Sequence, residues 1–512
     1  MTTASPPEAA APNRAMITGC VMLATIMQAL DTTIANVALP YMQGSVSASQ
    51  DQINWVLTSY IVAAAIMTPP TGWLAGRFGR KRLFLASVVG FTIASVLCGL
   101  AESLSQIVLF RLLQGVFGAA LVPLSQAVLL DTWPRDKQGS AMAMWGIGVT
   151  VGPILGPTLG GWLTDHYSWR WVFYINVPFG ILAFLGITTF LSETRRSISG
   201  RFDWFGFSML SLCVGALQLM LDRGELLDWF DSPEIIAEAV LSGLGLYLFI
   251  VHTATAERPF VTPALFRDRN FSTGLIFIFA LGIILYASLA LLSPFLQTLM
   301  GYPVVTAGIV MAPRGAGTML GMFVVGRLIG RIDTRLLLLI GFSLSAWSLW
   351  AMTGFNPNVS ESTMIWTGTA QGLGLGLLFV PLSTITFSTL APSLRNEATG
   401  LFSLLRNLGG SIGISVVTSM LTRNTQVNHA EIAAAVTPFN RQIQGDAVMR
   451  FWNPFTASGQ AALNDEVTRQ ASMIAYIDDF KFLMMIALLS IPLLVLLRKP
   501  RPGTAHDPVA IE

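Results

Sequence analysis

Long runs of apolar residues, separated by short polar breaks, recur along almost the whole chain. Each run has about 20 residues, the length at which a helix crosses a hydrocarbon core of about 30 Å. The pattern therefore predicts fourteen membrane-spanning helices. Eight lie near 15–39, 53–75, 83–101, 105–130, 139–163, 169–191, 203–221 and 234–253. Six more lie near 272–299, 304–326, 335–355, 363–390, 397–421 and 480–497.

The basic residues agree with this map, because cytoplasmic loops of membrane proteins carry an excess of Lys and Arg. With the N-terminus inside, 20 of the 30 Lys and Arg residues fall on segments assigned to the cytoplasm. The short outer loops hold only Arg170 and Arg223. We therefore predict a multi-pass protein of the bacterial inner membrane with both termini in the cytoplasm.

Composition supports a membrane protein. The chain is 53% hydrophobic and 11% charged, whereas soluble domains carry about 25% charged residues. Its three cysteines, Cys20, Cys98 and Cys213, all lie in apolar runs. This placement argues against a disulfide framework and favours a packing role for each thiol.

An internal repeat divides the spans. GWLAGRFGRKRL at 72–83 is echoed by GRLIGRIDTRLL at 326–337, and LLQGVFGAALVPLS at 112–125 by TAQGLGLGLLFVPLS at 369–383. Two duplicated six-helix halves are the plan of the major facilitator fold, an all-α membrane architecture that transports by rocking around a central cavity. The expected parts are a tail, a bundle, two inserted linker helices, a second bundle and a second tail, at 1–14, 15–200, 201–255, 256–499 and 500–512.

The segment 422–479 is long, mostly polar and external on this map. Leu463, Val467, Ala471 and Ile474 recur in it at helical spacing, so we expect the last span to begin as an amphipathic extension. Two interpretations remain open. The segment is either a spacer packed on the outer face or a docking surface for a periplasmic partner.

Signatures of enzymes and ATP-driven pumps are missing from the sequence. A P-loop needs Gly-Lys-Ser/Thr, and none of the four lysines follows a glycine. The four histidines are scattered without the spacing of metal ligands. We expect no enzymatic activity, no metal and no cofactor, which leaves an ion gradient as the source of energy.

Four ionisable residues stand out inside predicted spans, where an unpaired charge costs several kcal/mol. Asp31, in QALDTTIANVALP, is the only carboxylate well inside any of them. Burial disfavours the anion, so Asp31 is a candidate for binding and releasing protons; the alternative is a fixed partner of an arginine or a helix-end cap. Arg111 is a candidate switching partner or half of a static ion pair. Arg314 and Arg406 lie near glycines and either line a cavity that binds substrate or bond to backbone carbonyls.

The fifth span contains glycines at spacings of four and two prolines. These residues are Gly148, Gly152, Gly156, Gly160, Pro153 and Pro157. Glycines four apart share one face of a helix and permit close approach of a neighbouring backbone, and the prolines remove backbone donors and bend the helix. We expect tight packing at this face, and a gating role if the contact opens and closes.

The loop at 72–82 combines glycines with basic residues, among them Gly72, Arg77, Gly79 and Arg80. It is either a positive anchor on the cytoplasmic side or one of a pair of hinges, since the second half repeats it. Asp131, at the inner end of the fourth span, is a candidate partner for Arg77 or Arg80.

Together these strings resemble the drug:proton antiporters of the major facilitator superfamily, specifically the fourteen-span EmrB/QacA subfamily. The resemblance covers nearly the whole chain. It rests on LDTTIANVALP (30–40), GWLAGRFGRKRLF (72–84), RLLQGVFGAALVPLSQ (111–126), GPILGPTLGG (152–161) and WRWVFYINVPFG (169–180). LDRGELLDWF (221–230) and RDRNF (267–271) resemble EmrB-type members. The chain departs from the pattern at Gly76, where many members have an aspartate.

The resemblance implies multidrug efflux of hydrophobic or amphiphilic compounds in exchange for protons, by alternating access. It also implies a periplasmic adaptor protein and an outer-membrane channel as partners, which would give 422–479 a contact. By match to the motifs, Asp31 is the acidic position of the first span and Arg111 the arginine of the fourth. A dedicated exporter of one metabolite, siderophore or fatty acid remains an alternative. A polytopic transferase is a distant one, because a clustered His, Asp and Glu site is missing.

Overall fold

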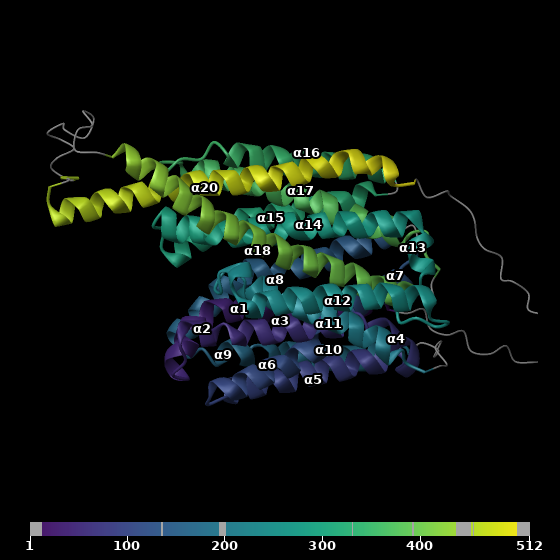
Figure 1. Ribbon diagram of the computed structural model, residues 1–512. Helices are drawn as coiled ribbons and strands as arrows, with labels where there is room; N and C mark the ends of the chain where they lie inside the picture. The colour runs from purple at the N-terminus through teal and green to yellow at the C-terminus, as the bar shows by residue number, and fades with distance from the viewer. Residues whose placement is uncertain are drawn as a thin grey trace, which may run out of the picture. The chain divides into compact units, whose positions relative to one another are not determined.

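The computed structural model describes residues 13–134, 137–193, 201–329, 331–391, 394–436, 452–453 and 455–498. Apart from one isolated bridge between Ile329 and Ile332, the regular structure in these residues is helical (Figure 1). The chain divides into two compact units. The first unit is Met1–Phe202 with Pro392–Gly400, and the second is Asp203–Ala391 with Leu401–Glu512. The expected tails lie almost wholly outside the described residues.

The first unit contains the helices of the expected N-terminal bundle. They are α1 (Arg14–Ser45), α2 (Gln50–Ile53), α3 (Trp55–Met67), α4 (Thr71–Phe78), α5 (Arg80–Leu100), α6 (Leu104–Gly118), α7 (Leu121–Thr132), α8 (Gln138–His166), α9 (Trp171–Tyr174) and α10 (Asn176–Phe190). Helix α1 packs against α8, α10 and α7, and α3 packs against α6. The long first helix is therefore the element around which this unit is assembled.

Two local signals set helix boundaries in the first unit. The expected span at 53–75 comprises two helices: α3 ends before Pro69 and Pro70, and α4 begins at Thr71. Two successive prolines remove two neighbouring backbone donors at this point, which interrupts the helical hydrogen bonds. Gly79 separates α4 from α5 with φ of 96°, a conformation that glycine adopts readily and other residues do not.

The second unit contains the remaining helices. They are α11 (Trp204–Arg223), η2 (Trp229–Asp231), α12 (Pro233–Thr255), α13 (Ala264–Arg267), α14 (Arg269–Pro294), η3 (Phe295–Leu299), α15 (Val304–Leu328), α16 (Thr334–Met352), α17 (Glu361–Phe387), α18 (Arg395–Ala435), α20 (Ala457–Leu493) and η5 (Leu494–Leu496). The first residues of α18 belong to the first unit. Helix α17 packs against α14, α15 and α16, whereas α11 and α12 pack against each other.

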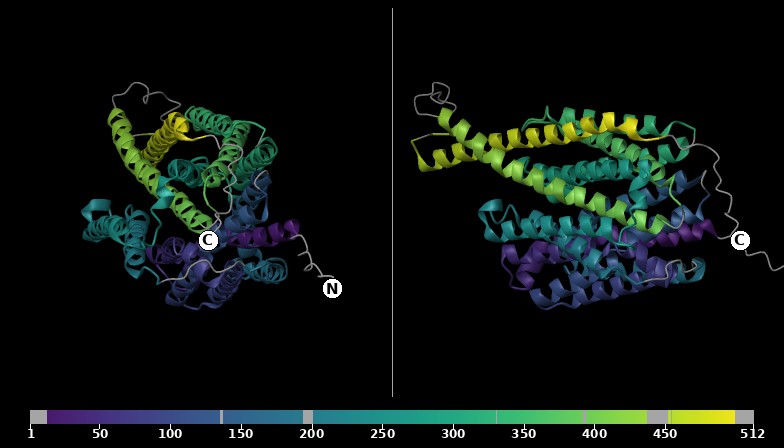
Figure 2. Two further views of the ribbon diagram at one scale, coloured as in Figure 1. Left: turned by 90° about the vertical axis from the view of Figure 1, so that its right-hand side faces the viewer. Right: turned by 45° about the vertical axis from the view of Figure 1, so that its right-hand side comes forward.

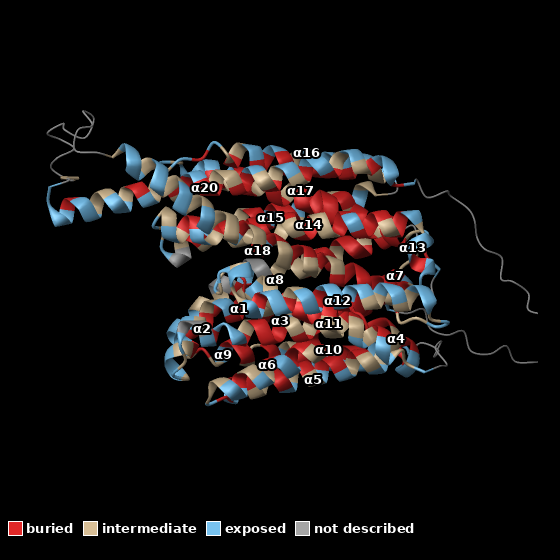
Figure 3. Ribbon diagram, viewed as in Figure 1, coloured by how far each residue is buried: buried red, intermediate tan, exposed pale blue. Residues whose placement is uncertain are grey.

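Burial separates core helices from peripheral ones (Figure 3). In the most apolar part of α17, 83% of the residues are buried, and in that of α12 only 11% are. An apolar helix that protein does not cover needs lipid around it. The exposed apolar side chains of α12 therefore mark a lipid-facing helix.

Twelve helices of the described residues are long and apolar enough to cross a membrane. The expected span at 53–75 contributes only the shorter apolar helix α3, and the one at 139–163 is α8, which is not among the twelve. The other expected spans each correspond to one of the twelve. Multiple membrane crossings are thus established by length and composition, and the count of fourteen stays a prediction.

Two helices of the second unit are longer than a membrane crossing needs. Helix α18 has 41 residues and α20 has 37, and one end of each runs past the other helices of this unit (Figures 1 and 2). The expected helical extension of the last span is confirmed, since α20 begins at Ala457. Val467 and Ala471 are buried there, and Ile474 is exposed. Residues 437–451, in the middle of the external segment, lie outside the described residues.

Candidate functional site

A buried ion pair joins α1 to α6 in the first unit. Nη1 of Arg111 lies 2.6 Å from Oδ2 of Asp31, and the side chains are 1% and 0% exposed. A pair with this little water contact is stable only when further hydrogen bonds satisfy both groups, because the desolvation of two ions is expensive.

Those further hydrogen bonds are present. Gln114 and Asn176 each donate to Oδ1 of Asp31, at 2.8 and 2.9 Å. Nε of Arg111 donates to the carbonyl of Val56 at 3.0 Å, and its Nη1 donates to Gln114 at 2.8 Å. Helices α1, α3, α6 and α10 thus converge on one charge pair, which together with Gln114 and Asn176 we call the polar cluster.

An aromatic ring completes the surroundings of Arg111. Its guanidinium carbon lies 4.3 Å from the centroid of the Tyr60 ring, a cation–π distance. Asn176 also donates to Ser95 at 2.9 Å, and Ser95 donates to the carbonyl of Phe173 at 2.8 Å. The hydrogen bonds of the cluster therefore continue into α5 and α9, which holds its side chains in fixed positions.

The sequence pointed to Asp31 and Arg111 separately but not to their supporting residues. Gln114 carried a weak signal, because it follows Arg111 by three residues and so shares its helix face. Asn176 lies in WRWVFYINVPFG (169–180), and nothing in that motif indicates a contact with Asp31. The structure brings all four side chains together.

The glycine face of α8 packs against α1. A Cβ at Gly152 would overlap the backbone carbonyl of Ala29, and one at Gly156 would overlap the Thr33 side chain. A Cβ at Gly160 would lie 2.8 Å from Cγ1 of Ile34. Thr33 donates to the carbonyl of Gly152 at 3.0 Å, which ties the two backbones together. The close approach expected at these glycines is thus present, with α1 as the neighbour.

The remaining residues of this motif contribute less to the contact. Gly148 has more room, since a Cβ there would lie 3.2 Å from Cε of Met22. Helix α8 continues through Pro153 and Pro157 without a break in its assignment. The side chains of both prolines lie outside the described residues.

Asp131 is the centre of a second ionic group in the first unit. It pairs with Arg80 at 2.7 Å and with Arg395 at 2.7 Å. Arg80 also donates to Asn396 at 2.8 Å. Of the two partners considered for Asp131, the structure selects Arg80 and leaves Arg77 exposed. The contact with Arg395 had no signal in the sequence, because more than 260 residues separate it from Asp131.

Gly72 lies beside this group. A Cβ on it would lie 2.6 Å from Cα of Glu397, too close for any other residue at this position. The loop and the segment 394–400 therefore meet backbone to backbone. Glu193 accepts hydrogen bonds from the backbone nitrogens of Lys81 and Arg82, at 3.1 and 3.2 Å, and so holds the start of α5.

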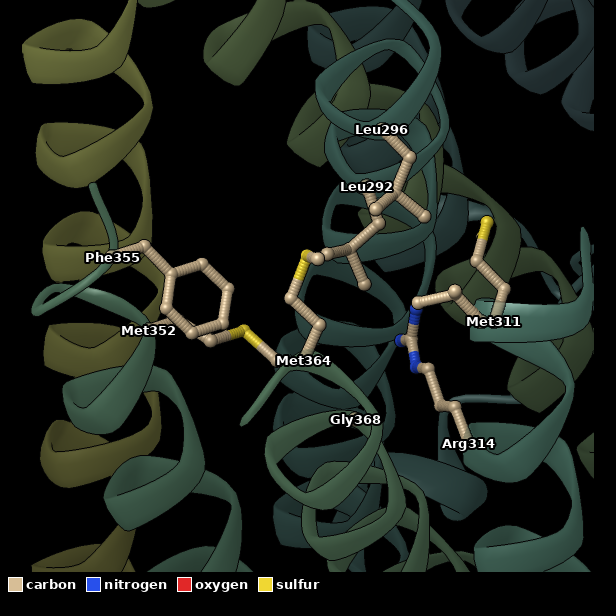
Figure 4. Close-up of a pocket in the computed structure, with 9 residues that line it drawn as sticks. Leu292, Leu296, Met311, Arg314, Met352, Phe355, Met364 and Gly368 are labelled. Atoms are coloured by element: carbon tan, nitrogen blue, oxygen red, sulfur yellow. The ribbon is translucent and has the colours of Figure 1, made fainter. Parts of the chain in front are cut away.

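Arg314 of α15 is buried in the second unit with incomplete partners. Its Nη2 donates to Ser288 at 2.6 Å and its Nη1 has no hydrogen-bond partner. No described carboxylate forms an ion pair with it. Figure 4 shows the guanidinium turned toward a cavity that is otherwise apolar. The lining residues are Leu292, Leu296, Val310, Met311, Arg314, Met352, Phe355, Met364 and Gly368.

This cavity is small in the present conformation. Its volume is about 20 Å³, enough for about one water molecule. A drug-sized ligand needs several hundred Å³, so the residues would have to separate before one entered. The lining thus combines one guanidinium group with the side chains of methionine, leucine and phenylalanine residues.

Arg406 of α18 also lies in the second unit. It is 6% exposed, and its Nε has no partner among the described residues. A Cβ at Gly282 of α14 would overlap its backbone carbonyl, so its surroundings are tightly packed. Arg406 does not line the cavity at Arg314. Both arginines contact α14, however: Arg406 at Gly282 and Arg314 at Leu285 and Ser288, less than two turns apart along that helix.

Metal-binding chemistry finds no support in the described part of the chain. No three His, Cys, Asp or Glu side chains gather there as a metal site requires. The polar cluster, the ionic group at Asp131 and Arg314 are among the places where ionisable side chains are buried, and the first two are held by ion pairs.

Comparison with known proteins adds the relatives of this chain. Residues 21–414 match the family model of the Major Facilitator Superfamily. The chain is 39% identical to the multidrug export protein EmrB of Escherichia coli over 84% of each chain. It is 37% identical to the fatty acid resistance protein FarB of Neisseria gonorrhoeae, over 95% of this chain and 96% of that one. The structure of the human organic anion transporter MFSD10 matches with a TM-score of 0.60 at 14% identity, covering 93% of this chain and all of that one.

Proposed function

The chain belongs to the Major Facilitator Superfamily, and from that membership we propose that it exports hydrophobic or amphiphilic drugs in exchange for protons, by alternating access. It is a multi-pass membrane transporter and not an enzyme. A relative named for multidrug export is 39% identical over most of the chain, which supports multidrug efflux. Proton coupling is the expectation for the family. The observation that supports proton coupling here is the Asp31 and Arg111 pair, two opposite charges buried between two candidate membrane spans.

Coupling follows from the geometry of this pair. A proton that binds to Asp31 neutralises the carboxylate and leaves Arg111 without a counter-charge at 2.6 Å. The ionised guanidinium then needs another partner or water. Asp31 and the residues that touch α8, Ala29 and Thr33, lie within five residues of α1. Protonation therefore acts on the same turns of α1 that pack against the glycine face.

The protein is proposed to lie in the bacterial inner membrane with both termini in the cytoplasm. The support is the distribution of Lys and Arg described above. In this orientation the ionic group at Asp131 is at the cytoplasmic end of its unit, and the extensions of α18 and α20 are periplasmic.

A periplasmic adaptor protein and an outer-membrane channel are the proposed partners. The extensions of α18 and α20 form a groove lined by His429, Ala433, Val436, Gln460, Leu463, Asn464 and Val467. Its mixed apolar and amide lining suits a protein helix. A spacer role for the same segment is the competing proposal.

The surroundings of Arg314 favour anionic amphiphiles as one class of cargo. A buried guanidinium without a carboxylate partner is suited to pair with a carboxylate group on a ligand, and the apolar lining suits a hydrocarbon tail. A relative at 37% identity is named for fatty acid resistance, which supports the same class. A dedicated exporter of a single fatty acid or metabolite is thus the second candidate function.

Transport by purified protein tests the proposal. In proteoliposomes with an acidic lumen, protons that leave should drive drugs inward, so at least one compound of a panel should accumulate. The panel holds hydrophobic cations, anions and neutral drugs, and protein-free vesicles control for trapping of weak bases. We expect several chemically different compounds to accumulate and the luminal pH to rise with each. Uptake of one compound alone would favour the dedicated exporter, and no response to the pH gradient would contradict proton coupling.

Arg314→Gln is expected to weaken transport of anionic amphiphiles selectively. Loss of a charge-assisted hydrogen bond costs roughly 1.5 to 3 kcal/mol, or about 10- to 100-fold in apparent affinity. The KM for a long-chain carboxylate should rise by that factor, with the KM for a neutral drug unchanged. Arg423→Gln, at an exposed arginine of α18, is the matched control. Equal effects of Arg314→Gln on anionic and neutral compounds would mean that Arg314 is structural.

A further inference from the structure

The second unit contains a buried carboxyl group that the proposed mechanism does not use. Asp479 of α20 is 0% exposed, and neither of its carboxyl oxygens has a hydrogen-bond partner among the described residues. The carboxyl group is thus shielded from bulk solvent and has neither a hydrogen-bond donor nor a counter-charge among the described residues. This is the reverse of Asp31, whose two oxygens are both occupied.

The neighbours of Asp479 are mostly apolar. On α20 it shares a buried face with Tyr476, Phe480 and Leu483. The rings of Tyr476 and Phe480 lie 5.3 and 6.3 Å from that of Phe295 in η3. Helix α20 packs against α14 and α16 along this face. The side chain is therefore enclosed in the core of the second unit.

No cation on the neighbouring elements is placed to compensate an anion at Asp479. The ionisable residues of α14 and α16 are Arg269, Tyr286 and Arg335, and η3 and η5 have none. Helix α18 meets α20 at His429, which bonds to Asn464, about 22 Å along the helix before Asp479. Arg269 and Arg335 donate to carbonyls of Leu496 and Leu497, about 25 Å along the helix from Asp479. Tyr286 lies against Gly410 of α18.

On α20 itself the titratable neighbours give no compensation either. Asp478 is another acid; it pairs with Lys481 at 3.1 Å, and both of these side chains are exposed to solvent. Tyr476 is neutral at ordinary pH. An ionised carboxylate that is shielded from solvent and has no donor or cation nearby is strongly disfavoured relative to the neutral acid. The surroundings of Asp479 therefore select the protonated form.

We propose that Asp479 is a second proton-binding site of the transporter, occupied in this conformation and emptied during the transport cycle. The inference rests on the proposed antiport and extends it to the second unit. Loading forms one O–H bond on the carboxylate with a proton taken from water, and release breaks that bond and returns the proton to water. Release requires a conformation in which α20 separates from α14 and α16, so that water reaches the anion.

The position of Asp479 suits loading from outside. It stands at the start of the apolar part of α20, and the polar extension of this helix precedes it. Phe480 lies 6.2 Å from Phe355, which lines the cavity at Arg314. In the proposed orientation this end of the unit is periplasmic, where protons are abundant in an energised cell. The site would therefore be filled by the gradient that drives export.

Infrared spectroscopy tests proton occupancy directly. A neutral carboxylic acid has a C=O stretching band that an ionised carboxylate and an amide do not share. At neutral pH the wild-type protein should show such a band, and Asp479→Asn should lack it. Asp478→Asn is the matched control and should keep the band. Absence of any difference between wild type and Asp479→Asn would overturn the proposal, because Asp479 would then be ionised.

The drug gradient tests whether the proton is exchanged. Each coupled proton contributes about a factor of ten to the drug gradient that one pH unit supports. In Asp479→Asn this gradient should fall about tenfold, because one fewer proton is exchanged for each drug molecule. Asp478→Asn should reach the wild-type gradient.

The two measurements separate the possible failures. An infrared band that Asp479→Asn removes, together with an unchanged drug gradient, would make Asp479 a structural acid and overturn its role in coupling. If the wild-type protein itself ignored the pH gradient, the proposed antiport would fail. The infrared comparison would then still decide whether Asp479 holds a proton.

Discussion

The Asp31→Asn variant is expected to build no drug gradient in proteoliposomes with an imposed pH difference, although it inserts into the membrane. Asparagine has the shape of aspartate but cannot exchange a proton at ordinary pH. The change also leaves Arg111 buried without its counter-charge, and removing one partner of a buried pair costs roughly 3 to 5 kcal/mol. We therefore expect a lower thermal unfolding temperature in detergent as well as a loss of coupled transport.

A second variant separates these two effects. Asp31→Asn combined with Arg111→Gln removes both charges, so the unfolding temperature should recover while drug accumulation stays absent. Asp165→Asn is the control for a carboxylate outside the cluster, since Asp165 is exposed and accepts a hydrogen bond from Tyr41 at 2.7 Å. A normal drug gradient in the Asp31→Asn protein would show that the pair is a static connection between helices.

Gly152→Ala is expected to damage both folding and transport. Its Cβ would overlap the backbone carbonyl of Ala29, and a backbone cannot rotate away as a side chain can. Overpacking of this kind costs about 1 to 3 kcal/mol. The thermal unfolding temperature in detergent and the initial rate of pH-driven drug uptake should both fall.

The matched control lies on the same helix. The atom nearest to a Cβ at Gly161 is Cγ1 of Val37, at 4.0 Å, so alanine fits there without displacement. Alanine also favours a helix over glycine by about 1 kcal/mol. Gly161→Ala should therefore be as stable as the wild type or more so, with normal uptake. Equal tolerance at Gly152 and Gly161 would mean that the contact between α1 and α8 is looser than the structure has it.

The sequence was enough to identify single candidate residues. The free-energy cost of placing a charged side chain in a membrane depends on the residue type and on the apolar run around it. Asp31 and Arg111 were identified in this way, as were the glycines of α8. Their partners could not be, because helical periodicity describes one face of a helix and does not say which other helix covers it. Gln114, Asn176 and α1 as the neighbour of α8 therefore needed the structure.

Asp479 shows the limit of reading spans from hydropathy. It lies one residue before the expected span at 480–497 and follows a second acid, Asp478, and a polar stretch. The hydropathy pattern therefore assigns it to the external segment. On the expected map Asp31 is the only carboxylate well inside a span. The map does not include Asp479, because this side chain is buried by packing against other helices and not by an apolar run around it. Long-range pairs such as Asp131 with Arg395 escape prediction for the same reason.

The contact between α1 and α8 also has a dynamic consequence. Glycines at every fourth position repeat the same flat surface about every 6 Å along α8. Tilting α1 away would break several close contacts at once, whereas a displacement along the helix axis would carry α1 from one glycine to the next. We therefore expect a charge change at Asp31 to move α1 along α8 rather than away from it.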